Sequence, residues 1–523
     1  MRTTRDRVLL AGDAVASGTE TAYRALAAAP GEAHAIRADL CAMHPGDVGP
    51  GRPILRLAHL TDMHLADTQS PLRLDFAMQV GERSPGWGGA VTYTFRPHEL
   101  MTAHAVDAML RTLRGLDLDL CVVTGDSTDN AQANELATYL ALMDGGEVAP
   151  VSAGGVYRGP QSAEWGDPWY WVPDVPGDRY QRRWGYPRIP GLTAAAAAPF
   201  RAAGAGTPWI GCLGNHDVLV GGTTAVSDEL DAIAVGGRKA VGLPAGLGDE
   251  RELELYLRDP VRLFSGPGVD VPADPERRLL RTRDIVRAHL GRGGAPGPAG
   301  RGYTADNLRA GTAYYRYDPV PGVRVLVLDT NHRQGMWDGN VDRAQLEWLA
   351  DELRGLDGPD DPLVVIASHH ATPSLGNAYG VCPDDHAAVA FAAELLEVAL
   401  SCPNVVLWLN GHHHANRVVA HHRPRGGGLY EVTTASMIDW PTQARVIELV
   451  RQPDGVLRMT STIVDHDAPL DPGPDPRSPG ELASLHRRLA ANDVWRGGAR
   501  QGLTGTPPDR NVHLLVPPVR PVR

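Results

Sequence analysis

The feature that most limits the folds open to this chain is a series of short apolar segments, each of which ends abruptly in polar residues. Their apolar, β-branched composition predicts strands. Between most of them, apolar residues recur at the spacing of a helix, which predicts helices over 98–116, 130–144, 342–356 and 384–400. Alternation of strands and helices is typical of an α/β fold. The six strand-like segments are 53–62, 119–126, 208–217, 323–330, 362–370 and 404–413.

The pattern changes from about residue 417 onward, where four strand-like segments follow one another without a helix and predict a β meander. Two earlier segments are longer than ordinary connections. For the first segment, a peripheral addition without function and a lid or wall of a substrate site are equally open interpretations. For the second segment, the addition without function is favoured. We expect a β-rich extension over 1–50, a main domain over 51–465 with insertions at about 145–207 and 218–311, and a C-terminal helix with an irregular tail over 466–523.

The composition argues against several classes of protein. The 523 residues carry a formal net charge of -12, whereas non-specific nucleic-acid binders are normally basic. The five cysteines are scattered without a Cys-x-x-Cys pair, so we expect neither a disulfide framework nor a thiolate metal site. Because no apolar stretch is long enough for a membrane span and the N-terminal residues lack the apolar core of a signal peptide, we expect a cytoplasmic location by default.

The residues at the strand ends have the chemistry of metal ligands. Imidazole nitrogens with carboxylate and amide oxygens are typical of sites for manganese, iron or zinc. Residues two apart on an extended segment point the same way, so we expect Asp62 with His64, and His412 with His414, to face one ligand. The strand-end groups are Asp62 and His64; Asp126 and Asp129; Asn215, His216 and Asp217; His369 and His370; His412, His413 and His414.

Taken in order, these groups match five motifs: D-x-H, GD-x-x-D, GNH-D, a strand-end histidine and GH-x-H. Each motif alone is weak, but the five together resemble the calcineurin-like metallophosphoesterase superfamily. The resemblance covers about 53–450 without the insertions, and 345–349 is similar to that family's Q-x-x-W-L helix. The long inserts resemble those of a small actinobacterial subgroup. The resemblance implies a four-layer α/β/β/α sandwich of two mixed sheets with long insertions.

The resemblance also implies a role for each strand-end residue. Two divalent transition-metal ions, manganese, iron or zinc, would share Asp126 as a bridging ligand. His216 would face the substrate, with Asp217 orienting it and Asp129 bracing the loop. The ligands would be Asp62, His64, Asp126 and His414 for the first ion, and Asp126, Asn215, His369 and His412 for the second.

Three neighbouring residues leave alternatives open or limit the subtype. His370 is either the ligand in place of His369 or a neighbour that faces the substrate; we favour His369 as the ligand. His413 points opposite to its two neighbours and is expected to be structural or to support a metal ligand without binding the metal itself. Asp129 stands where the purple acid phosphatases of this superfamily place a tyrosine, which disfavours the ferric subtype.

The implied function is a hydrolase that cleaves a small-molecule phosphate ester, with monoesters and diesters both open. A metal-bridged hydroxide would attack phosphorus, and His216 would act as the acid for the leaving group. The alternatives are a metal-dependent nuclease with a polymeric substrate and a catalytically silent binding module of the same fold. Only 178–188 combines arginines with aromatic residues as a nuclease surface would, and the chain's acidity counts against nucleic acid. The complete ligand set disfavours the silent module.

Overall fold

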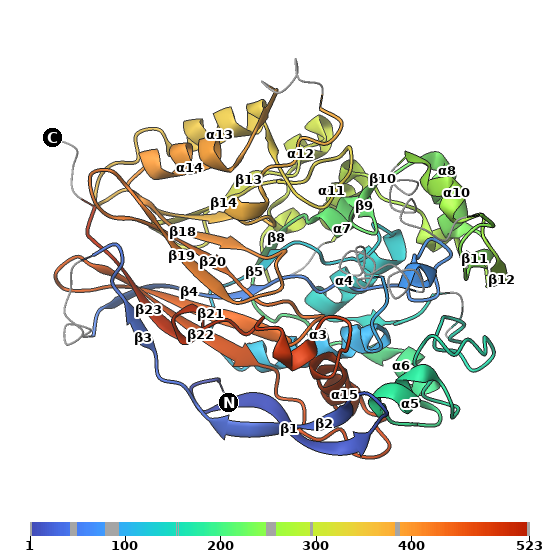
Figure 1. The fold of residues 1–523 in the computed structure, drawn as a ribbon. Coiled ribbons are helices and arrows are strands. Elements are labelled where there is room, and N and C mark those ends of the chain that lie inside the picture. The colour runs from blue at the N-terminus through green and yellow to red at the C-terminus, as the bar shows by residue number, and fades with distance from the viewer. Residues whose placement is uncertain are drawn as a thin grey trace.

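The computed structural model describes residues 3–41, 50–78, 94–152, 154, 156–246, 258–292, 296–381 and 388–519. Two mixed sheets form its centre (Figure 1). The seven-stranded sheet has the order β3 (Ala35–Arg37), β23 (Val512–Val516), β22 (Leu457–Asp465), β21 (Gln443–Arg451), β4 (Arg52–Leu60), β5 (Leu120–Thr124) and β8 (Trp209–Cys212). The six-stranded sheet has the order β13 (Tyr315–Tyr317), β14 (Val323–Val327), β16 (Leu363–Ala367), β18 (Val405–Asn410), β20 (Gly428–Thr433) and β19 (Arg417–His422).

The parallel parts of both sheets are built from the predicted apolar segments. In the first sheet β4, β5 and β8 are parallel neighbours, and in the second β14, β16, β18 and β20 are. Carboxyl ends of parallel neighbours lie at one edge of a sheet, so the polar residues that follow these strands gather there. The predicted α/β fold with mixed sheets is confirmed.

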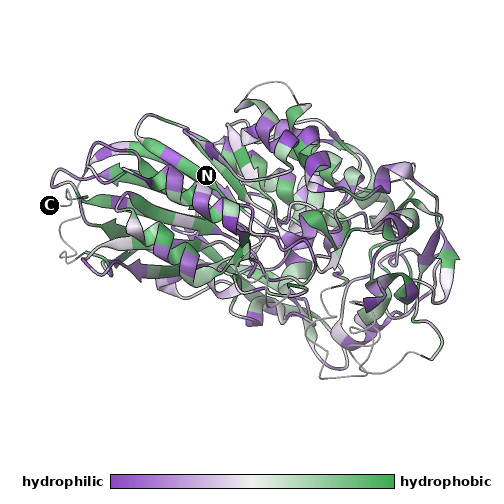
Figure 2. Ribbon diagram, turned by 90° about the horizontal axis from the view of Figure 1, so that it is seen from above, coloured by the Kyte–Doolittle hydropathy of each residue, from purple (hydrophilic) through white to green (hydrophobic). Residues whose placement is uncertain are grey.

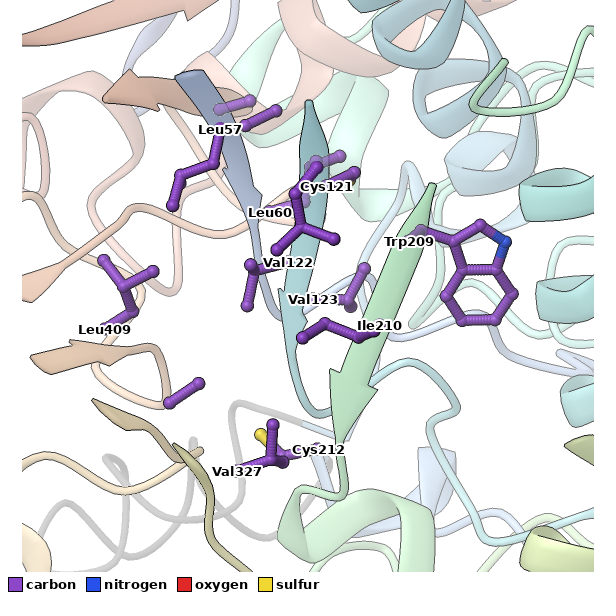
Figure 3. Packing of buried hydrophobic residues seen from close by; sticks show 14 of the residues in the cluster. Leu57, Leu60, Cys121, Val122, Val123, Trp209, Ile210, Cys212, Val327 and Leu409 are labelled. Carbon is purple, nitrogen blue, oxygen red and sulfur yellow. The ribbon is translucent and has the colours of Figure 1, made fainter. Parts of the chain in front are cut away.

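A large apolar cluster joins the facing strands of the two sheets. Its members alternate along the strands, because Val365 and Leu407 belong to this cluster while Ile366 and Trp408 belong to a second one beside the helices. Figure 3 shows side chains of β4, β5 and β8 near Val327 of β14 and Leu409 of β18. Burial on both faces explains why these strands are continuous apolar runs.

Helices cover the outer faces of this core. The second cluster places α13 (Arg343–Leu353) and α14 (Ala392–Ser401) against the six-stranded sheet, and α3 (Thr102–Arg114) packs into the first cluster with the other sheet (Figure 1). Seen from above, the strands consist largely of hydrophobic residues, whereas the surrounding helices combine hydrophobic and hydrophilic residues (Figure 2). Within the described residues no helix combines the length and hydropathy that a membrane crossing needs.

Most of the remaining elements in the described part of the chain are short or peripheral. Its other helices are α4 (Ala133–Asp144), α5 (Arg179–Trp184), α6 (Leu192–Ala197), α7 (Asn215–Val218), α8 (Asp228–Val235), α10 (Pro260–Leu263), α11 (Thr282–Leu290), α12 (Ala305–Ala310) and α15 (Pro479–Ala491). The two-stranded pairs are β1 (Arg7–Ser17) with β2 (Ala22–Pro30), β6 (Glu147–Val148) with β7 (Phe200–Arg201), β9 (Leu219–Val220) with β10 (Thr224–Ala225), β11 (Arg238–Ala240) with β12 (Gly268–Asp270), and β15 (Val341–Asp342) with β17 (Val389–Ala390).

The first insertion packs on the C-terminal helix α15. A separate apolar cluster combines Tyr180 and Trp184 of α5 with Leu485 and Leu489 of α15. Trp171 is fully buried and donates from Nε1 to the Pro187 carbonyl oxygen at 3.0 Å. Most of the aromatic residues of this insertion therefore serve packing, including those of the segment considered as a nucleic-acid surface.

The second insertion is tied to the loop that follows β4. Buried Lys239 forms an ion pair with Asp75, and buried Arg277 donates from Nε to Asp67 Oδ2 at 2.8 Å. Both acids lie a few residues beyond His64 in the sequence. Burial of charged side chains is tolerated only with such partners, so this insertion supports the loop next to the strand-end residues.

Three elements differ from the sequence-based expectations. The four C-terminal strands form no single meander, because β19 and β20 join one sheet while β21 and β22 join the other. The tail is not wholly irregular, since β23 lies between β3 and β22. The helix expected over 384–400 begins only at Ala392, after the short strand β17. Residues 384–387 of the expected range lie outside the described part of the chain.

Acid should destabilise the fold through buried neutral histidines such as His59 on β4. Its two ring nitrogens pair with the hydroxyls of Thr124 and Thr434, each at 2.8 Å. Burial lowers the pKa of His59 to about 3, so below its ordinary value near 6.5 only the unfolded chain takes up the proton. The free energy of unfolding should therefore fall by about 1.4 kcal/mol per pH unit from this residue as the pH decreases from 6.5.

Denaturant unfolding between pH 7 and 5 would measure this effect. The His59→Asn variant should show the shallower pH slope, and His422→Asn, which changes an exposed histidine, should keep the wild-type slope. Equal slopes for wild type and His59→Asn would contradict the assignment.

Candidate metal centre

The polar ends of strands from both sheets meet in one place. Asp62 follows β4 and Asp126 follows β5, whereas His369 follows β16 and His414 follows β18. His414 Nε2 lies 3.3 Å from Asp62 Oδ1, and His369 Nε2 lies 3.3 Å from Asp126 Oδ2. The ligand candidates are thus contributed by two sheets that face each other across the core.

The backbone at these strand ends is not extended. Asp62, His64 and Asp126 have φ values of 51°, 46° and 49°, and His412 and His414 have 68° and 54°. Non-glycine residues rarely adopt this left-handed region, and the strain of such residues, on the order of 1–3 kcal/mol each, is typical of functional sites. Asp62 and His64 do converge, but by left-handed turns and not by the strand alternation that we expected. His412 and His414 contact different neighbours, His412 beside His369 and His414 beside Asp62.

Glycines before the candidate ligands permit close approach of the loops. A Cβ atom on Gly214 would lie 2.1 Å from Asp126 Oδ1, and one on Gly411 would lie 1.9 Å from Thr61 Oγ1. No side chain can occupy such space, which explains why glycine stands at both positions of the GN and GH motifs.

One half of the centre is formed around His64 and His414. His64 donates from Nδ1 to Asp129 Oδ1 at 2.9 Å, and His414 donates from Nδ1 to Asp439 Oδ2 at 2.6 Å. Because each Nδ1 is held in this way, each Nε2 faces inward, and the two Nε2 atoms lie 3.1 Å apart. The carboxylate of Asp62 lies beside both, with Oδ1 at 3.9 Å from His64 Nε2.

The other half is formed around His369. Its Nδ1 donates to the Thr124 carbonyl oxygen at 2.8 Å, which directs Nε2 inward. There Nε2 lies 3.0 Å from Asn215 Oδ1 and 3.2 Å from His412 Nδ1. The Asn215 amide is oriented by its own donation to the Gly222 carbonyl oxygen at 2.9 Å, so its oxygen faces the centre.

Asp126 lies between the two halves. Its Oδ2 is 3.3 Å from His369 Nε2 and 3.5 Å from His64 Nε2, while Oδ1 accepts from the His216 backbone at 2.8 Å. Groups of donor atoms within 4.8 Å of one another include Asp62 with His64 and His414, and Asp62 with Asp126 and His369. The two groups overlap, which is the arrangement that a pair of neighbouring cations requires.

The electrostatics of the centre favour positive charge. Burial lowers the pKa of His369 and His414, but the carboxylates of Asp126 and Asp62 more than offset it and raise each pKa to about 9. Burial opposes ionisation of Asp126, yet the surrounding histidines, His369 first, hold its pKa well below the usual range. The same ring nitrogens and carboxylate oxygens that bind a proton here can bind a metal cation, which displaces that proton. The residues present therefore fit a pair of transition-metal ions.

His216 lies at the rim of the centre with part of its ring exposed. Its Nδ1 donates to the Asp129 carbonyl oxygen at 2.8 Å and lies 3.6 Å from Asp129 Oδ1. The expected orienting role of Asp217 needs correction, because Asp217 accepts from Thr128 and Gly214 backbone N–H groups at 2.9 and 2.8 Å and holds the loops together. Asp129, expected to brace the loop, pairs with Arg73 of the loop after β4 and also contacts the rings of His64 and His216.

Sequence reasoning missed several residues that hold the centre in place. Asp439 accepts from His414 and also pairs with Arg96 at 3.0 Å and with Arg496, all of them buried. Asp439, His98 and Asp493 form a further group of possible metal ligands, but the two guanidiniums already supply the positive charge there. Asp439 follows a strand, as the predicted ligands do, and that position was the available signal.

The other histidines near the centre have partners of their own. His370 pairs through Nδ1 with Thr330 Oγ1 at 2.8 Å and donates from Nε2 to the Trp337 carbonyl oxygen at 2.9 Å. Its ring therefore lacks a free nitrogen, which favours His369 as the ligand candidate. His413 is exposed, and His332 donates to the Tyr379 carbonyl oxygen at 2.6 Å.

Comparisons with known proteins give distant structural likenesses. No protein-family model and no curated protein sequence matches this sequence. Among solved structures the chain is similar to a dimetal phosphatase from Danio rerio, with 12% identity and a TM-score of 0.37 over 79% of this chain and 97% of that one. It is also similar to PhoD, with 13% identity and a TM-score of 0.32 over 80% of this chain and 67% of that one. A third similar structure is GAP50, the anchor in the inner membrane complex of Plasmodium, with 10% identity and a TM-score of 0.30 over 79% of this chain and 85% of that one. Likenesses at this level carry no argument about function.

Proposed function

We propose that this protein is a dimetal phosphoesterase that hydrolyses a phosphate ester of a small molecule. The observation that carries the proposal is the convergence of imidazole and carboxylate groups on both sides of Asp126, whose Oδ2 lies 3.3 Å from His369 Nε2 and 3.5 Å from His64 Nε2. Two facing mixed sheets flanked by helices support a four-layer α/β/β/α sandwich, and the long insertions are in keeping with the subgroup proposed from the sequence.

The ligand assignment follows the two halves of the centre. Asp126 lies between the halves, and His64, His369 and His414 each have the outward ring nitrogen held by a hydrogen-bond acceptor. His412 Nε2 lies 3.7 Å from Asp338 Oδ1, and the His412 backbone N–H donates to Asp62 Oδ2 at 3.0 Å. We propose Asp62, His64, Asp126 and His414 as ligands of one cation, and Asp126, Asn215, His369 and His412 as ligands of the other.

Two bound divalent cations would lower the pKa of a water molecule and neutralise charge on the phosphate. The chain itself supplies the proton for the leaving alkoxide. Since His216 Nδ1 donates to the Asp129 carbonyl oxygen, Nε2 is the ring nitrogen left to face a leaving oxygen. We propose that His216 Nε2 donates to the leaving oxygen.

Hydrolysis of p-nitrophenyl phosphate and bis-p-nitrophenyl phosphate would test this function. Protein supplied with Mn²⁺, Fe²⁺ or Zn²⁺ should release p-nitrophenol from at least one ester, EDTA should stop the reaction, and the transition metal should restore it. Ca²⁺ is the matched control and should not restore it, because it prefers oxygen ligands only. Turnover that survives EDTA dialysis, or the absence of turnover with all three metals, would refute the proposal.

A further inference from the structure

We infer that Asp439 and Arg496 are positioning residues for His414, and that the first insertion serves to seat the turn that carries Arg496. The inference rests on the proposed function, because it takes His414 as a metal ligand. The insertion would then support a metal ligand through buried contacts, and would not act as a lid over the metal centre.

Asp439 lies on the connection by which the chain crosses from β20 in one sheet to β21 in the other. The connection is fixed beside the centre, because Met437 and Ile438 donate backbone N–H groups to the Asp62 carbonyl oxygen at 3.1 and 3.3 Å. The backbone N–H of Asp439 donates to Ser436 Oγ at 3.0 Å, which holds the residue in place. From there its Oδ2 accepts from His414 Nδ1, so the orientation of the His414 ring depends on where this carboxylate lies.

Two guanidiniums fix the Asp439 carboxylate. Arg96 donates from Nε to Oδ1 at 3.0 Å, and Arg496 donates from Nη1 to Oδ2, the oxygen that also accepts from His414. Both arginines are about 96% buried, so solvent screens these pairs little. A carboxylate bound on both oxygens cannot rotate, and it presents one lone-pair direction to the histidine.

Arg496 reaches Asp439 from the turn that follows α15. Asp493 shapes this turn by accepting from the backbone N–H groups of Trp495 and Arg496 at 2.9 and 3.2 Å. Trp495 in turn donates from Nε1 to the Tyr180 hydroxyl at 2.8 Å and packs edge-on against Trp184, with ring centroids 5.6 Å apart. Tyr180 and Trp184 belong to α5 of the first insertion, so contacts continue from the insertion through Trp495, Arg496 and Asp439 to His414.

Calorimetric titration of Arg496→Met with Mn²⁺ alone would test the inference without any activity assay. One of the two binding steps should weaken by about 10–100-fold, the usual effect of losing a partner behind a metal ligand, and the other should keep its wild-type Kd. Arg496→Lys should recover part of the loss. Arg488→Met is the matched control, because Arg488 lies on α15 and hydrogen bonds to Asp471 and not to Asp439. Unchanged Kd values for both steps in folded Arg496→Met would overturn the inference.

Hydrogen exchange on the unmodified full chain is a second test that needs no folded variant. Coupling between two sites is reciprocal, so loading with Zn²⁺ should slow amide exchange at 493–496 as well as at 62–64. The hairpin of β1 and β2 should exchange at the same rate with and without Zn²⁺. Protection at 62–64 without any at 493–496 would overturn the inference.

The two proposals fail in different ways. A wild-type protein that binds two cations but hydrolyses no ester would end the proposed phosphoesterase function and leave the positioning inference intact. A hydrolytic wild type whose Arg496→Met variant binds Mn²⁺ normally would end only the inference.

Discussion

Replacement of His216 by alanine is expected to lower kcat by about 10²–10⁴-fold while both cations stay bound. The expectation follows from the ring's position at the rim of the centre, because Nδ1 is occupied by the Asp129 carbonyl oxygen and the partly exposed ring leaves Nε2 for the substrate. Loss of an acid matters most when the leaving oxygen is basic. The decrease in kcat should therefore be larger for an alkyl phosphate than for p-nitrophenyl phosphate, whose leaving group needs little protonation.

Steady-state kinetics with both esters and metal analysis of the same samples would check this result. His413→Ala is the matched control, since His413 is exposed and should affect neither turnover nor metal content. His64, Asp126 and His216 also form a group of possible metal ligands. If His216→Ala loses a cation, His216 is a ligand and the proposed acid role is wrong.

The strands around the centre could be predicted because their apolar character is local. β16 and β18 are buried on both faces, so each is an uninterrupted apolar run that ends where the polar residues begin. The ligand candidates follow those ends directly, and glycines that admit close loops mark them in the sequence. Sequence order therefore located the donor groups without knowledge of which sheet each strand joins.

Adjacency in the sequence misled the assignment of Asp217. His216 and Asp217 lie together on the short helix α7, where successive side chains point about 100° apart. Asp217 consequently turns toward Thr128 and Gly214, and the neighbour that contacts the His216 ring is Asp129, from another strand end. Contacts of this kind depend on how two loops pack and leave no local pattern.

Asp439 and β23 escaped prediction for the same long-range reason. Asp439 lies in a crossing between sheets that a sequence of consecutive strands does not reveal, and its partner Arg496 is 57 residues away. β23 ends at Val516 directly before two prolines, which favour irregular chain, but its pairing with β22 and β3 fixes it in the sheet. Both features need the tertiary structure because their stabilising partners come from distant segments.

Replacement of Asp126 by alanine is expected to have the largest effect on both metal content and turnover. Asp126 Oδ2 lies close to ring nitrogens of both halves, His64 Nε2 at 3.5 Å and His369 Nε2 at 3.3 Å. Bound cations should fall below two per chain, and turnover should fall by about 10³-fold or more, because the charge that holds two cations together is removed. Metal analysis after dialysis, together with p-nitrophenyl phosphate turnover, would measure both.

Asp126→Asn separates loss of charge from loss of structure. The amide oxygen can still accept from the His216 backbone N–H, which donates to Asp126 at 2.8 Å, so the loop should keep its shape. Asp62→Asn is the matched control, because Asp62 lies beside His414 and belongs to the proposed ligands of one cation only. We expect it to weaken one Mn²⁺ binding step, whereas Asp126→Asn should weaken both. If Asp126→Asn retains two cations and full turnover, Asp126 does not bridge, and the centre must be two separate sites.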